Sequence, residues 1–255
     1  MPGRHLYVPE YYENVERSAE RSARSLLPIV LELLRPRSVC DVGCGTGVWL
    51  RVFGELGVSD VVGIDAPTVP RRLLKISEQR FHATDLARED PVLGRTFDLA
   101  MSLEVAEHLP ADRAARFVST LTSLAPVVMF GAAIPGQGGT SHLNEQWPDY
   151  WAKLFEQHDY AALDVLRHRV WGDPQVEYWY AQNTFLYVRR DRLRDPALES
   201  AISAAGSAFP VRAVHPGLLG VYAAEHHELV ARAIPARQRL TDALRRRLRR
   251  IAPAR

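Results

Sequence analysis

The stretch "VCDVGCGTGVWL" at residues 39–50 decides the fold. An apolar run ends at Asp41, and Gly43, Gly45 and Gly47 follow at every second position before apolar residues resume. Glycine lets the backbone approach a ligand closely, and the N-terminus of a following helix offers free N–H groups. The stretch therefore predicts a buried strand, a ligand-binding turn and a helix, in that order.

The spacing of the glycines separates this turn from the dinucleotide-binding fingerprint. The pattern G-x-G-x-x-G requires Gly or Ala at position 48, where this chain has Val48. An acid inside the turn is a poor neighbour for a pyrophosphate, whereas it suits a cationic ligand with an amino group. The turn thus fits a nucleotide-like ligand that carries an amino group, and it fits a hydride-transfer dinucleotide poorly. A strand-to-helix turn that binds no ligand is the alternative.

Strands and helices alternate along the rest of the first half of the chain. Short apolar runs at residues 58–65, 80–86, 96–103 and 126–134 predict strands, and the pattern over residues 109–125 predicts a helix between two of them. Such alternation is typical of βαβ units in a mostly parallel sheet. Three further segments complete the expectation: a helix over residues 15–34, a short helix at 148–160, and an antiparallel hairpin made by 162–171 and 177–190.

Composition limits the classes of protein that the chain can belong to. With 255 residues, 47% of them hydrophobic and 24% charged, it fits one large domain with or without extensions. No apolar stretch approaches the roughly 18 residues of a membrane span, and no signal-peptide pattern begins the chain. Only Cys40 and Cys44 are present, which favours a reducing, cytoplasmic location. The net charge of +2 gives no argument for polyanion binding.

Two more acids follow at the ends of predicted strands. Asp65 ends the second strand about twenty residues after the turn, where a carboxylate can accept both hydroxyls of a ribose, and Asp85 closes the third. A single acid at a strand end is common, but acids at the ends of three successive strands, together with a G-x-G-x-G turn, form a specific pattern. In these motifs, over roughly residues 37–190, the sequence resembles the class I S-adenosylmethionine-dependent methyltransferases.

The resemblance implies a fold, a cofactor and a set of binding residues. The fold is α/β: a Rossmann-like, seven-stranded, mostly parallel sheet with a reversed last strand and helices on both faces. The cofactor is S-adenosyl-L-methionine, with the glycine turn at its methionine moiety, Asp65 at its ribose and Asp85 with Leu86 at its adenine. The expected cofactor-binding residues are Asp41, Gly43, Cys44, Gly45, Gly47, Asp65, Ala66, Asp85, Leu86 and Leu103.

A second cluster of polar residues follows the fourth predicted strand, in "SLEVAEHLP" at residues 102–110. Glu104, Glu107 and His108 stand at i, i+3 and i+4, so one helical turn would place them on one face, in the crevice beyond the sheet. His142 lies in a glycine-rich loop after the fifth strand, at the same end of the sheet. Two carboxylates and two imidazoles offer a divalent-cation site with open positions for substrate oxygens.

This set resembles the Glu-x-x-Glu-His plus distant His of the small-RNA 2′-O-methyltransferases, and its first part resembles the ubiquinone-biosynthesis O-methyltransferases. The resemblance implies a Mg or Mn ion, held by Glu104, Glu107, His108 and His142, that binds the acceptor hydroxyl. Glu107, His108 and His142 are also the expected catalytic residues, with His142 as general base if no metal binds. In other methyltransferases a Glu-His pair here only caps a helix or supports the cofactor pocket.

Three functions remain open on the sequence alone. The first is an O-methyltransferase acting on a small-molecule hydroxyl, of a sugar or another natural product. The second is an RNA ribose 2′-O-methyltransferase, but acids interspersed through the catalytic half argue against nucleic acid. The third is a cofactor-binding protein without catalysis, which the glutamate-histidine cluster argues against.

The expected organisation has three parts: an N-terminal helical cap (1–36), the cofactor-binding methyltransferase domain (37–190) and a helical C-terminal extension (191–255). The Arg-rich tail at 237–255 is either a solvated terminal helix, which we favour, or a contact for RNA, an acidic carrier or a membrane surface. Aromatic residues of the second half are expected in the core for the most part; they are Trp147, Trp151, Trp171, Trp179 and Tyr180.

Overall fold

The computed structural model describes residues 9–205, 212–226 and 228. The principal helices and strands, in chain order, are α1 (Pro9–Leu34), β1 (Ser38–Val42), α2 (Val48–Glu55), β2 (Asp60–Asp65), β3 (Phe81–Ala83), β4 (Leu99–Leu103), α3 (Ala114–Leu124), β5 (Val127–Gly131), α4 (Pro148–Glu156), β6 (Tyr160–Leu163), α5 (Arg167–Val170), α6 (Tyr178–Asn183), β7 (Phe185–Arg189) and α7 (Pro196–Ala205).

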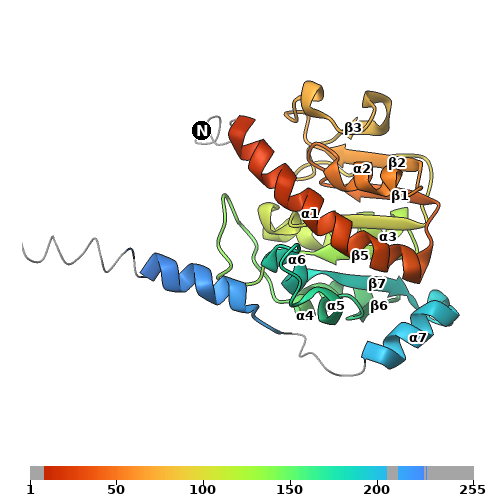
Figure 1. Ribbon diagram of the computed structural model, residues 1–255. Helices are drawn as coiled ribbons and strands as arrows, with labels where there is room; N and C mark the ends of the chain where they lie inside the picture. The colour runs from red at the N-terminus through yellow and green to blue at the C-terminus, as the bar shows by residue number, and fades with distance from the viewer. Residues whose placement is uncertain (1–8, 206–211, 227, 229–255) are drawn as a thin grey trace, which may run out of the picture. The chain divides into compact units, whose positions relative to one another are not determined.

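The strands form one seven-stranded sheet in the order β3-β2-β1-β4-β5-β7-β6 (Figure 1). Strands β1 to β5 pair in parallel, whereas β7 runs antiparallel to both β5 and β6. The predicted Rossmann-like sheet with a reversed last strand is therefore confirmed. The carboxyl ends of β1 and β4 lie side by side at the centre of the sheet, which is where such folds bind ligands.

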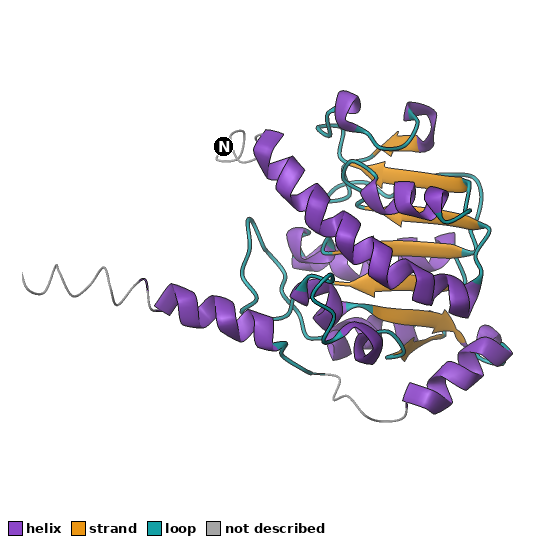
Figure 2. Cartoon of the chain, viewed as in Figure 1, coloured by secondary structure: helices purple, strands orange, loops and turns teal. Residues whose placement is uncertain are grey.

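Helices cover both faces of this sheet (Figure 2). On one face α1, α2, α5, α6 and α7 contribute to a buried apolar cluster that includes Leu27 and Val39; on the other, α3 and α4 contribute to a cluster that includes Cys40 and Leu121. Successive residues of β1 thus face opposite clusters, which explains why the strand reads as an unbroken apolar run.

The predicted C-terminal hairpin is only partly correct. Its antiparallel pairing exists between β6 and β7, but the strands are short, and α5 and α6 occupy much of the two predicted strand segments. Arg167 in α5 is fully buried: its guanidinium donates to Asp164 and to the Gln182 carbonyl and lies over the Phe185 ring. These contacts between distant segments override the local strand preference of the aromatic and β-branched residues.

Beyond β7, α7 packs against α1 and buries Leu198. The segment from Val214 onward forms a separate unit, in which a helix is described over residues 216–226. The Arg-rich tail at 237–255, with its predicted helix, lies outside the described residues. Among the helices that are described, none is long and apolar enough to cross a membrane.

Candidate active site

The glycine turn connects β1 to α2, as the sequence predicts, and each of its glycines has a positive φ: Gly43 at 91°, Gly45 at 55° and Gly47 at 86°. A Cβ on Gly43 would lie 2.3 Å from a methyl of Val105, so only glycine fits there. Gly47 is the N-cap of α2. The turn thus brings bare backbone to the carboxyl ends of the central strands.

Asp65, at the end of β2, holds this turn in shape. One carboxylate oxygen accepts a hydrogen bond from the backbone N–H of Gly45 and the other from Ala66, both at 2.6 Å. Burial raises the pKa of Asp65, and the two N–H donors act in the opposite direction. The acid that the sequence assigns to the ribose therefore also connects β2 to the glycine turn.

Asp41 lines a cavity of about 750 Å³ that opens beside the turn. The residue is only 2% exposed, and burial followed by the charge of Asp65 raises the pKa of Asp41 well above its usual value. A carboxyl in such a place is stabilised in its charged form by an ammonium group. Asp41 is thus suited to the amino group of a ligand in the cavity.

The cavity is large enough for a ligand of several hundred Å³. Five predicted cofactor residues line it: Asp41, Gly43, Cys44, Gly45 and Leu103. Three further acids (Glu16, Glu104 and Glu107) and both predicted histidines (His108 and His142) also line it. Four aromatic side chains from α2 and α6 complete the wall: Trp49, Tyr178, Trp179 and Tyr180.

The other predicted cofactor residues lie outside this lining, which leaves their roles as predictions. Asp85 accepts a hydrogen bond from the backbone of Ala87 at 3.2 Å, within its own turn. Leu86 is buried in the apolar cluster on the α3 face. The remaining three, Gly47, Asp65 and Ala66, belong to the turn region already described.

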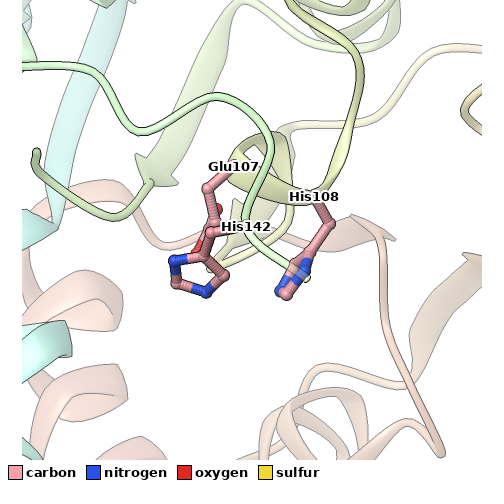
Figure 3. Close-up of side chains that lie close together, drawn as sticks. All are labelled: Glu107, His108 and His142. Atoms are coloured by element: carbon pink, nitrogen blue, oxygen red, sulfur yellow. The ribbon is translucent and has the colours of Figure 1, made fainter. Parts of the chain in front are cut away.

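Glu107, His108 and His142 come together at the cavity wall (Figure 3), with one ligand atom from each within 4.8 Å of the others. The two imidazoles meet edge to face, with ring centroids 4.8 Å apart. Glu107 is 0% exposed, and neither of its carboxylate oxygens makes a well-formed hydrogen bond with the described residues, although the Ala133 N–H and the Glu104 carboxyl lie close enough to affect its pKa. A buried carboxylate without a well-formed hydrogen bond is costly, so this site favours a cation or a proton.

Glu104 departs from the prediction that it shares one helical face with Glu107 and His108. It has a φ of 55° and precedes the 3-10 turn Ala106–His108, so the helical spacing does not apply to it. Its carboxylate accepts hydrogen bonds from the side-chain amides of Gln137 at 2.7 Å and Asn183 at 2.8 Å. The structure therefore groups three of the four predicted ligands, and Glu104 lies beside them with its oxygens already bonded.

Glu145 orients His142. The Nδ1 atom of His142 lies 2.8 Å from the Glu145 carboxylate, which also accepts hydrogen bonds from the backbone N–H groups of Gly136 and Gly138. When Nδ1 carries the proton donated to Glu145, Nε2 is left with its lone pair free to bind a cation or accept a proton. Glu145 is not among the site residues predicted from the sequence, although its place three residues after a candidate histidine is a local signal.

The loop that carries His142 is attached to the cluster through its backbone. The N–H groups of Leu143 and Asn144 both donate to the Glu107 carbonyl, at 2.7 and 3.0 Å. Gly139 packs on the imidazole, because a Cβ there would lie 2.4 Å from Nε2 of His142. The position of His142 is thus fixed by the loop's hydrogen bonds to Glu107 and by the packing of Gly139.

The ionisation of the cluster follows from its burial. Burial raises the pKa of Glu104 to about 7, and burial followed by the charge of Glu104 raises the pKa of Glu107 well above its usual value. Burial and the neighbouring His142 lower the pKa of His108. A neutral imidazole can ligate a cation or accept a proton, and an arriving cation would displace the proton that Glu107 otherwise retains. The donor set of Glu107, His108 and His142 therefore fits a divalent cation.

A model of the methyltransferase domain family matches residues 12–168. The chain belongs to the methyltransferase domain family. Its resemblance to class I S-adenosylmethionine-dependent methyltransferases is thereby confirmed, and S-adenosylmethionine is its methyl donor. No curated protein sequence matches the chain.

Solved structures with the same fold have low sequence identity to this methyltransferase. The sugar N-methyltransferase KedS8 from Streptoalloteichus is 18% identical, with a TM-score of 0.57 over 74% of this chain and 96% of that one. DesVI from Streptomyces venezuelae is 15% identical, with a TM-score of 0.52 over 70% and 95% of the two chains. Magnesium protoporphyrin IX methyltransferase from Synechocystis, with bound SAH, is 19% identical, with a TM-score of 0.50 over 72% and 89%.

Proposed function

We propose that this methyltransferase transfers the methyl group to a hydroxyl of a small acceptor, a sugar or another natural product. The observation that supports this is the buried carboxylate of Glu107, which makes no well-formed hydrogen bond with the described residues, beside His108 and His142 on the wall of the cavity that the glycine turn lines. An amine needs only to lose a proton near neutral pH, whereas an alcohol needs a positioned base or a cation. A cluster of this kind suits the alcohol.

In this proposal Glu107, His108 and His142 hold one divalent cation, Mn or Mg. The bound cation would supply a Lewis acid that lowers the pKa of the acceptor hydroxyl. Two nitrogen ligands suit Mn better than Mg. Glu145 keeps the His142 ring oriented, as carboxylates behind metal-bound histidines do.

The acceptor would lie against the aromatic wall of the cavity. Tyr178, Trp179 and Tyr180 from α6 line the same space as the glutamate-histidine cluster, and aromatic faces pack well on sugar rings and flat natural products. Among the described lining residues none is Lys or Arg, which disfavours an RNA backbone. The similar structure of a sugar N-methyltransferase supports a sugar-sized acceptor, and the cluster leads us to oxygen as the methylated atom.

A second candidate mechanism has no metal, and the 2.8 Å contact between His142 Nδ1 and Glu145 favours it. In that case Nε2 of His142 takes the hydroxyl proton directly, and Glu145 stabilises the imidazolium that forms. Glu107 then keeps its own proton. We also propose a cytoplasmic location, because Cys40 and Cys44 are buried free thiols.

Product analysis with candidate sugars and natural-product alcohols tests the proposal. We expect an O-methyl product by mass spectrometry and NMR, loss of turnover with a chelator, and rescue by Mn or Mg. Full turnover by chelated, metal-free enzyme together with an inactive His142→Ala variant would establish His142 as a general base and exclude the metal. An N-methyl product would remove the reason for a strong base.

A further inference from the structure

Three segments far apart in the sequence meet at Thr46 in the glycine turn. The Thr46 hydroxyl donates to one carboxylate oxygen of Glu16 in α1 at 2.8 Å, and the other oxygen lies 3.0 Å from the ammonium of Lys75. The backbone N–H of Lys75 in turn donates to the Thr46 carbonyl at 2.7 Å. Glu16, Thr46 and Lys75 therefore close a ring of contacts between α1, the glycine turn and the segment after β2.

The residues of this ring are buried or partly buried, so their contacts contribute to stability. Thr46 is only 4% exposed, and the side chains of Glu16 and Lys75 are 17% and 34% exposed. Next to it, the side chain of Ile76 packs on Gly47, where an added Cβ would lie 3.1 Å from Ile76. Hydrogen bonds to charged groups are stronger than neutral ones, and partial burial protects them from screening by salt.

The same contacts form part of the cofactor cavity. Glu16, Ser18 and Ala19 from α1 line it together with Thr46 and the rest of the turn. Helix α1 crosses the sheet (Figure 1), and Glu16 connects it to the glycine turn through the hydrogen bond from Thr46. The rest of α1 is held by its buried apolar face, which includes Ala23 and Leu27, so the Glu16 contacts bear on the part of α1 that lines the cavity.

We propose that Glu16 is a positioning residue for the cofactor. With Thr46 and Lys75 it forms a latch that keeps α1 closed over the glycine turn, and breaking the latch speeds the release of S-adenosylmethionine and of its demethylated product. The latch acts through the turn and needs neither the acceptor nor the proposed cation. Its test is therefore independent of the methylated atom.

Glu20, one helical turn further along α1, provides a matched control. It makes ion pairs with Arg24 at 2.8 Å and with Arg51 at 2.7 Å, but it neither contacts the glycine turn nor lines the cofactor cavity. Glu16→Ala and Glu20→Ala each remove one partly exposed, ion-paired carboxylate from the same helix. Only the first substitution opens the latch.

The experiment measures the affinity and the release rate of S-adenosylhomocysteine on the full chain by calorimetry and stopped-flow fluorescence. We expect Glu16→Ala and Thr46→Val each to weaken binding about tenfold, mostly through faster release, and the double variant to be no worse than either single one, because both break the same latch. Glu20→Ala should stay within about twofold of the wild type.

Thermal unfolding of the ligand-free variants separates a latch from a general loss of stability. If Glu16→Ala and Glu20→Ala lower the melting temperature alike but only Glu16→Ala releases the ligand faster, the latch is supported. Wild-type affinity and release in both Glu16→Ala and Thr46→Val would overturn it. An equal loss of affinity in Glu20→Ala would overturn it too, because the effect would then come from the helix as a whole.

Discussion

The carboxylate of Asp65 receives two backbone N–H groups, one of them from the glycine turn. Asp65→Ala should weaken the binding of S-adenosylhomocysteine by about 1 to 3 kcal/mol, because both the turn and the expected ribose contact lose an acceptor. Calorimetry measures this. Asp60→Ala is the control, since Asp60 begins the same strand and pairs only with the exposed Arg95 among the contacts described. Equal affinity in the wild type and Asp65→Ala would contradict the assignment.

Glu104 should make stability depend on pH. Its folded-state pKa is raised to about 7 from an ordinary value of 4.5, mainly by burial. A carboxyl whose pKa is raised by folding contributes stability that is fully present below its unfolded pKa and is lost as the pH rises through the folded one. Without added metal, the melting temperature of the wild type relative to that of Glu104→Gln should therefore fall between about pH 5 and pH 8. A pH-independent difference would contradict the raised pKa.

The positions of some site residues were predictable from the sequence, and the positions of others were not. The grouping of Glu107, His108 and His142 was predictable, because each follows a strand that ends at the same edge of a parallel sheet. The placement of Glu104 was not, because its positive φ breaks the helical spacing. Gln137 and Asn183, which bind the Glu104 carboxylate, carry no local signal, since only the folded chain brings the end of α6 and the loop after β5 to the residue that follows β4.

At the scale of elements, the loop of residues 135–146 should control catalysis through the position of His142. Gly139→Ala would place a Cβ 2.4 Å from Nε2 of His142, so the ring must move. Gly138→Ala also strains a positive φ, of 70°, but its Cβ meets no atom within 4 Å. We expect turnover to fall at least tenfold more in Gly139→Ala than in Gly138→Ala, because catalytic groups tolerate little displacement.

Steady-state kinetics with any accepted substrate decides between the two glycine variants, and calorimetry checks that both still bind S-adenosylhomocysteine. Equal turnover in the two variants would mean that the position of His142 does not limit the reaction. Two backbone hydrogen bonds from this loop to the Glu107 carbonyl hold His142 at the cluster.

The elements themselves were predictable to different degrees. The strand, turn and helix around Gly43 follow from local chemistry, because a glycine at positive φ and an apolar strand have few alternatives. The segments that became α5 and α6 are rich in aromatic and β-branched residues and read as strands. Arg167 of α5 is buried and donates to the Gln182 carbonyl of α6, a contact between segments that the local sequence does not encode.

At the scale of the molecule, the sheet brings the glycine turn after β1 and the cluster after β4 to one cavity because β1 and β4 are neighbours. The residues expected to bind the methyl donor and the residues proposed to activate the acceptor therefore line one space. This arrangement allows the transferred carbon to lie in line between donor sulfur and acceptor oxygen, as methyl transfer requires. The proposed reaction depends on what Glu107, His108 and His142 bind.

Calorimetric titration of Mn²⁺ into the full chain saturated with S-adenosylhomocysteine tests this most directly. A cation site at these residues should bind one ion per chain, and binding should tighten as the pH rises because Glu107 and the imidazoles must be unprotonated. His142→Ala should lose that binding with unchanged affinity for S-adenosylhomocysteine. Absence of Mn²⁺ binding by the wild type at pH 8, or undiminished binding by His142→Ala, would contradict such a site.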